Sequence, residues 1–146
     1  RMEMLKDVTK RFVEGDKRLG LRGRPNDLIG VVSFSRGAHV LSPLTLDHET
    51  VLHELNKLQV NRDPNQLGTS LGYAIFKTAN LIAATRRFGK EAVAKGEPSY
   101  DIKNFVILLV TDGFQETNPD DFNNPLRSIE VPEAVEFAKK EGIRLY

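Results

Sequence analysis

The stretch that decides the fold is FVILLVTDG, Phe105 to Gly113. Its first six residues, 105–110, are apolar without a polar break, which is typical of a strand buried on both faces in a parallel sheet covered by helices. The run stops at Thr111 and Asp112. Because ligands of open α/β sheets sit just beyond the carboxyl ends of the strands, Asp112 is a candidate site residue. The stretch alone leaves open the alternative that Asp112 only caps the following turn.

The composition of the 146 residues is ordinary for one soluble globular domain. The net charge of +1 gives no overall field that favours nucleic acid or an anionic membrane. The absence of cysteine excludes disulfides, thiolate metal sites and cysteine nucleophiles. No apolar run approaches the roughly 20 residues that span a bilayer. The chain begins inside a helical pattern and ends on a strand pattern, so we expect it to be a piece of a longer protein.

Hydrophobic periodicity predicts helices alternating with strands. The predicted helices cover 1–14, with an apolar face of Leu5, Val8 and Phe12, then 47–58, about 70–87 and 131–141. The predicted strands cover 28–34, 38–41, 105–110 and 143–146. This order is typical of a doubly wound α/β domain with a mostly parallel sheet flanked by helices.

Thr69 stands at the start of the third predicted helix, within GTSLG at 68–72. Its hydroxyl is suited to cap the helix, and the turn itself is a candidate phosphate site, although no P-loop or GxGxxG is present. A helix N-terminus and the carboxyl end of a strand share one rim of such a sheet, so Thr69 and Asp112 converge there. Hydroxyl and carboxylate oxygens are hard ligands for Mg²⁺ or Ca²⁺, but two are too few for a complete site.

Other polar residues admit both a site interpretation and a structural one. The loop 15–25 contains four basic residues that are either a phosphate-binding patch or a solvated insertion, and the lack of interleaved aromatic residues favours the insertion: Lys17, Arg18, Arg22 and Arg24. Three carboxylates after Asp112 are either extra ligands or a solvated loop without EF-hand spacing: Glu116, Asp120 and Asp121. We interpret the histidines as surface residues: His39, His48 and His53.

Taken together, these segments resemble a bacterial von Willebrand factor A (VWA) domain, especially those of aerotolerance-operon (Bat-type) membrane proteins. The matching segments are RME at 1–3, DLIGVVSF at 27–34, PLTLD at 43–47, GTSLGYAI at 68–75, VILLVTDG at 106–113 and GIRLY at 142–146. The resemblance covers nearly the whole chain and identifies residues 1–146 as a single domain. It implies a protein-interaction or adhesion module, not an enzyme.

The resemblance also implies a metal-ion-dependent adhesion site that binds Mg²⁺ and an acidic side chain of a partner protein. The family site combines an Asp-x-Ser-x-Ser run after the first strand, a Thr that matches Thr69 and an Asp that matches Asp112. This sequence has no Asp-x-Ser-x-Ser, because Val31 stands where Asp would precede Ser33 and Ser35. We therefore expect Mg²⁺ binding by this chain to be weak or absent.

By the same resemblance, the chain lacks the central first strand, and its C-terminal strand and helix are incomplete. We expect two apolar strand edges to remain unpaired unless the parent protein, or a strand-swapped or edge-paired second copy, fills the gap. The resemblance implies a soluble domain of a membrane-anchored bacterial inner-membrane protein. The alternative function is a phosphate- or nucleotide-processing enzyme that uses Asp112 and GTSLG, although no nucleophile and base are readable. Nucleic acid is not an expected partner.

Overall fold

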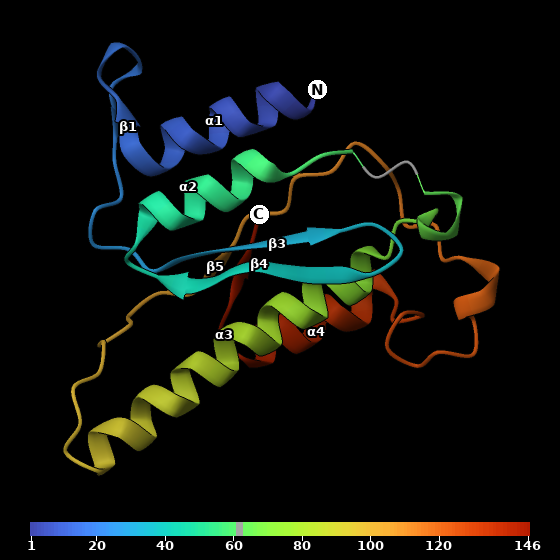
Figure 1. Cartoon of the computed structure of the whole chain (residues 1–146). Helices are drawn as coiled ribbons and strands as arrows, with labels where there is room; N and C mark the ends of the chain where they lie inside the picture. The colour runs from blue at the N-terminus through green and yellow to red at the C-terminus, as the bar shows by residue number, and fades with distance from the viewer. Residues whose placement is uncertain (61–62) are drawn as a thin grey trace. The chain divides into compact units, whose positions relative to one another are not determined.

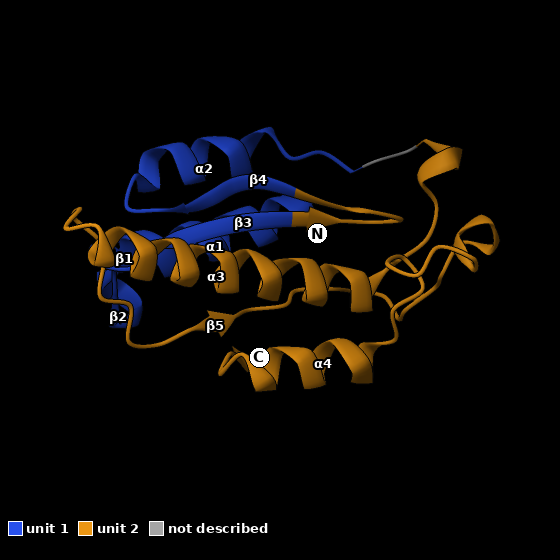
Figure 2. Ribbon diagram, turned by 90° about the horizontal axis from the view of Figure 1, so that it is seen from below, with its two compact units in different colours: residues 1–32, 40–62 blue, residues 33–39, 63–146 orange. Residues whose placement is uncertain are grey.

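The computed structural model describes residues 1–60 and 63–146, which divide into two compact units. Unit 1 comprises Arg1–Val32 and Val40–Arg62, and unit 2 comprises Ser33–His39 and Asp63–Tyr146 (Figure 2). Each unit is described by itself below. In the described part of the chain, no helix has both the length and the apolar character needed to cross a membrane.

Unit 1 contains two helices, α1 at Met2–Glu14 and α2 at His48–Lys57 (Figure 1). Asp47 caps α2, because its Oδ1 accepts a hydrogen bond from the Thr50 backbone N–H at 3.1 Å. The sequence prediction of both helices is confirmed. His48, predicted to be a surface residue, is instead half-buried, and its Nε2 lies 2.7 Å from the carbonyl oxygen of Asp27.

The buried face of α1 differs from the predicted one. Val8 and Phe12 are 58% and 37% exposed, whereas Val13 is 3% exposed. Val13 packs in the unit 1 cluster with Leu52, Leu55 and Ile29. The predicted face is therefore wrong for Val8 and Phe12, while Leu5 is half-buried; the side of α1 that carries Val13 meets the cluster.

The predicted loop 15–25 is partly a hairpin. Its strands are β1 at Gly15–Asp16 and β2 at Leu21–Arg22, paired antiparallel, with the 3-10 helix η1 at Lys17–Leu19 between them. A second pair is formed by β3 at Ile29–Phe34 and β4 at Ala38–Thr45. These two strands are confirmed, although β4 is longer than predicted and β3 is half-buried along its whole length.

Unit 2 is built on α3 at Leu71–Ala94 and α4 at Val131–Lys140, which lie side by side (Figure 1). Ile75, which is 1% exposed, packs with Ile129 and Ala134 in their shared cluster. The predicted end of the third helix near Arg87 is wrong, because α3 continues through Gly89 for 24 residues in all. The fourth helix and its stop before Gly142, at φ 71°, are confirmed.

The stretch 105–113 forms a short strand, β5 at Val106–Ile107, which pairs in parallel with β6 at Arg144–Leu145. Hydrogen bonds extend the pairing to the chain end: Tyr146 N donates to Ile107 O at 3.0 Å, and Leu109 N donates to Tyr146 O at 2.8 Å. Because α4 connects the two strands, this part of unit 2 is a β-α-β unit.

The predicted burial of this strand on both faces is wrong. Ile107 is 6% exposed and Leu109 packs against the cluster between α3 and α4, whereas the alternate residues Val106, Leu108 and Val110 are 42%, 52% and 62% exposed. The alternation arises because helices cover only one face of the pair. Nor do the described residues form a doubly wound, mostly parallel sheet: they form three two-stranded sheets, and β5 has one strand neighbour.

Candidate functional site

Thr69 and the segment after β5 meet at the start of α3. Thr69 pairs with Glu116 in an antiparallel bridge: Thr69 N donates to Glu116 O at 2.8 Å, and Glu116 N donates to Thr69 O at 2.9 Å. A Cβ built on Gly113 would lie 3.8 Å from Thr69 Oγ1. The Thr69 hydroxyl therefore lies beside the turn that contains Asp112.

The start of α3 does not use the Thr69 hydroxyl. Ser70 is the N-cap residue, and its hydroxyl donates to the carbonyl oxygen of Arg36 at 2.8 Å. The Gly72 N–H is satisfied by Gln115 Oε1 at 2.8 Å. The predicted capping role of Thr69 is therefore wrong.

The GTSLG turn has little capacity for phosphate. Phosphate binding at a helix N-terminus depends on free backbone N–H groups. Three of these groups are already bonded, from Thr69 to Glu116 O, from Ser70 to Ser35 O and from Gly72 to the Gln115 side chain. This arrangement does not favour the phosphate- or nucleotide-processing alternative.

Asp112 lies on an exposed turn, within which the Gly113 N–H donates to Thr111 Oγ1 at 3.2 Å. Thr69 and Asp112 offer oxygens of the kind that Mg²⁺ prefers. Elsewhere in the described ranges, no three His, Cys, Asp or Glu side chains are grouped so as to hold a metal ion. The donor set therefore fits a hard cation in kind but supplies too few ligands for a complete coordination shell.

Asp121 is a structural residue, contrary to its interpretation as part of a solvated loop. Its side chain is 5% exposed, and its carboxylate accepts from Arg36 Nε at 2.6 Å, from Arg36 Nη2 at 3.2 Å and from Arg127 Nη1 at 3.1 Å. The hydrogen bond from Arg36, together with the Arg127 contact, lowers the pKa of the Asp121 carboxyl. The same bond raises the pKa of Arg36.

Arg36 connects the turn between β3 and β4 to the rest of unit 2. Its Nη1 donates to Asn65 O at 2.8 Å, and its own carbonyl accepts from Ser70 Oγ. Gln115 makes a second connection, between Gly72 and Ile129. Its Oε1 accepts from Gly72 N, and its Nε2 donates to Ile129 O at 3.2 Å. Sequence analysis missed Arg36, Gln115 and Arg127, because contacts across as many as 85 residues leave no local pattern.

Comparison with known proteins gives one match. The model of the von Willebrand factor type A domain family matches residues 1–115. No curated protein and no solved structure matches the chain. The matched range contains both GTSLG and the strand that ends in Thr111-Asp112-Gly113. Because it also covers well over half of the 146 residues, the chain belongs to the von Willebrand factor type A domain family.

Proposed function

We propose that this chain binds an acidic side chain of a partner protein through a divalent cation, with Thr69 and Asp112 among the cation ligands. Domains of this family are generally protein-interaction or adhesion modules and typically not enzymes, which supports the interaction role. The observation that carries the metal proposal is the Thr69 hydroxyl. It is released from helix capping and lies beside the Asp112 turn, 3.8 Å from a Cβ built on Gly113.

The remaining ligands come, in this proposal, from an Asp-x-Ser-x-Ser run on a strand outside residues 1–146. Bound Mg²⁺ supplies a positive centre with a coordination position for the partner's carboxylate. Among the described residues β5 has one strand neighbour, β6, which supports the missing strand, because an unpaired strand edge is a template for another strand. The order of the motifs further supports a Bat-type parent with a membrane anchor elsewhere in its sequence.

Calorimetric titration with Mg²⁺ tests the metal site. The chain of residues 1–146 is expected to bind Mg²⁺ weakly or not at all, because Thr69 and Asp112 leave most of the coordination shell to water. A version extended before Arg1 by an apolar strand ending in Asp-x-Ser-x-Ser is expected to bind Mg²⁺ about tenfold to a hundredfold more tightly.

Variants of the extended version locate the site. Thr69→Val and Asp112→Asn should each abolish the gain in affinity, since each removes a ligand oxygen or its charge. Thr69→Ser keeps the hydroxyl and Asp101→Asn changes an exposed carboxylate of the 95–105 segment, so both should retain the gain. Submicromolar Mg²⁺ affinity in the unextended chain, or a gain that survives Thr69→Val, would contradict the proposal.

The unpaired edge of β5 predicts self-association of the chain. Leu108→Lys places a charge on the exposed face of this strand and is expected to weaken any dimer at least about tenfold. Lysines on an edge strand oppose the addition of another strand, and the contact also loses a half-exposed leucine. Sedimentation velocity over a range of concentrations measures the effect. Val93→Lys, at a 64% exposed position of α3, is the matched control; equal weakening by both variants would exclude β5 as the contact.

A further inference from the structure

The β1–β2 hairpin of unit 1 has a fixed base. Asp16 Oδ1 accepts from the Arg18 backbone N–H at 2.9 Å and caps η1, while its Oδ2 lies 3.5 Å from Arg11 Nη1 of α1. The Arg24 N–H donates to Val13 O at 2.8 Å where the chain leaves the hairpin. Two points of α1 therefore hold the tip of the hairpin, Lys17–Leu21, in a defined position.

The tip presents two apolar side chains to solvent. Leu19 and Leu21 are 61% and 47% exposed. Gly20, between them, has φ 65°, and a Cβ built on it would meet no atom within 4 Å. The tip is thus unobstructed, which suits insertion of two leucines into an apolar phase at a surface.

Positive charge surrounds these leucines. The segment 15–27 contains four basic residues and only Asp16 and Asp27 as acids. Asp16, whose side chain is 9% exposed, pairs with Arg11 and Arg18, and Asp27 pairs with Arg24 at 3.6 Å. In the ranges that the structure describes, Lys17 and Arg22 have no acidic partner, so the tip has an excess of positive charge.

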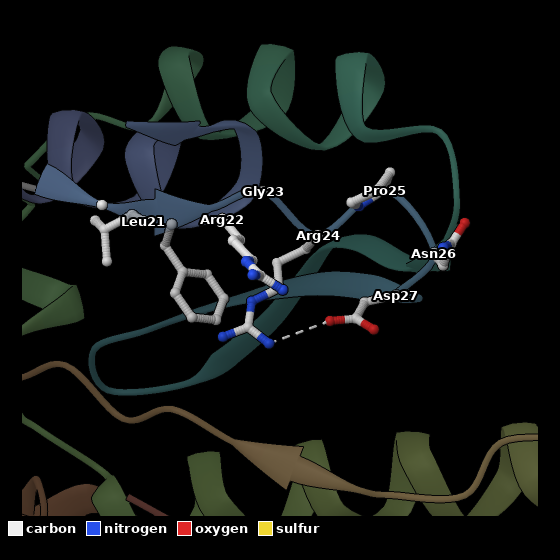
Figure 3. Close-up of a pocket in the computed structure, with 9 residues that line it drawn as sticks. Leu21, Arg22, Gly23, Arg24, Pro25, Asn26 and Asp27 are labelled. Carbon is white, nitrogen blue, oxygen red and sulfur yellow. Dashed lines mark ion pairs between the residues drawn. The ribbon is translucent and has the colours of Figure 1, made fainter. Parts of the chain in front are cut away.

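A pocket of about 470 Å³ adjoins the tip, lined by Phe12 of α1 and by residues 20–27 (Figure 3). The Arg24 guanidinium lies 4.7 Å from the centroid of the Phe12 ring. This cation–π contact holds the planar group by its face. Its Nη1 lies 3.6 Å from Oδ2 of Asp27, which also lines the pocket, so the other N–H groups remain for an anion. Arg22 lines the same pocket, so two guanidinium groups are available to oxygens of a phosphate.

We propose that this pocket and the hairpin tip form a docking site for an anionic phospholipid surface, independent of the cation site of unit 2. Arg22 and Arg24 bind the headgroup phosphate, while Leu19 and Leu21 enter the boundary of the acyl chains. A phospholipid accounts for both features, because its phosphate lies directly beside an apolar phase. Nucleic acid offers no apolar phase for Leu19 and Leu21, and the ring of Phe12, which lines the pocket, already has the Arg24 guanidinium over its face.

Vesicle co-sedimentation of the whole chain tests this site. Vesicles of phosphatidylcholine and phosphatidylglycerol in equal amounts should bind the chain, increasingly weakly as salt is added, and vesicles of phosphatidylcholine alone should not. Arg22→Gln is expected to lower the partition coefficient about fivefold, and Leu19→Ser about tenfold. Both positions are exposed, and unchanged circular dichroism will show that the fold is retained.

Matched controls change an exposed cation and an exposed leucine elsewhere, Lys95→Gln and Leu46→Ser, and should leave binding unchanged. Equal binding to both kinds of vesicle, or equal losses in the controls, would overturn the proposal. So would displacement by millimolar glycerol phosphate, which indicates a site for a soluble anion. Binding of poly-glutamate as strong as that of the mixed vesicles, and as sensitive to Arg22→Gln, would assign the site to acidic peptides instead.

Discussion

Replacing Gly72 with alanine is expected to lower the free energy of unfolding by about 2 kcal/mol or more, the net of about 3 kcal/mol of overpacking strain and about 1 kcal/mol of helix propensity gained. Gly72 lies in the first turn of α3, where a Cβ would sit 2.0 Å from Ile129 O and 2.8 Å from Ile129 C. Those atoms belong to the backbone that leads into α4. Relief of the clash therefore requires the two helices to separate, which also stretches the hydrogen bonds that the Gln115 amide makes with Gly72 N and Ile129 O.

Urea denaturation followed by circular dichroism measures the loss. Gly37→Ala is the matched control: Gly37 is also buried, but its Cβ would meet only His39 Nε2 at 3.6 Å, an ordinary contact. The control is expected to unfold at nearly the wild-type urea concentration. Wild-type stability in Gly72→Ala would mean that α3 and α4 do not approach each other this closely in solution.

Asp121→Asn is expected to lower the thermal unfolding midpoint by about 10 °C at neutral pH, since breaking a buried ion pair is strongly destabilising. The substitution keeps the size of the side chain but leaves Arg36 and Arg127 without their shared anion. Arg36 is itself only 17% exposed, so water replaces the lost contact poorly. Differential scanning calorimetry measures the shift, and Asp120→Asn, at an 80% exposed side chain 3.8 Å from Arg36, is the control.

The stabilisation by Asp121 is also expected to depend on pH. Because the hydrogen bond from Arg36 lowers the pKa of this carboxyl in the folded state, the stabilisation is fully present above the ordinary aspartate pKa of about 4. It is lost as the pH falls through the lower, folded-state value. The difference in unfolding midpoint between wild type and Asp121→Asn should thus shrink below about pH 4. A difference that stays constant would show that the negative charge of Asp121 is not what stabilises the fold.

The sequence predictions succeeded where the interactions are local in sequence and failed where they join distant segments. Helix α2 was predictable because its cap at Asp47 and its apolar spacing lie within a dozen residues. The length of α3 was not predictable, because glycine has a low helix propensity and yet Gly89 lies inside the helix. The apolar run of β5 predicted a strand, but how many of its faces are covered depends on which elements pack beside it.

The candidate site shows the same division. The residue types of Thr69 and Asp112, and their places at a helix start and a strand end, were readable from the sequence. The sequence did not show whether the Thr69 hydroxyl caps α3. Two other groups take its place: the adjacent Ser70 is the N-cap residue, and Gln115 accepts the hydrogen bond from the Gly72 N–H, 43 residues away. From the sequence, Asp121 is likewise only one of several acidic residues in a polar loop. Its role appears in the structure, where Arg36, 85 residues away, donates a hydrogen bond to it.

By itself, the sequence determined the family, most helices and strands and the two candidate oxygen ligands, because motifs and periodicity are local properties of the chain. Only the tertiary structure decided that β5 is covered on one face, that Thr69 is not a cap, and that Arg36 and Asp121 join the segments around the site. These outcomes depend on which groups far apart in the sequence compete for the same hydrogen bonds and the same apolar surface. In FVILLVTDG, the sequence marks a strand and its terminal carboxylate, and the packing of α3 and α4 determines which of its residues are buried.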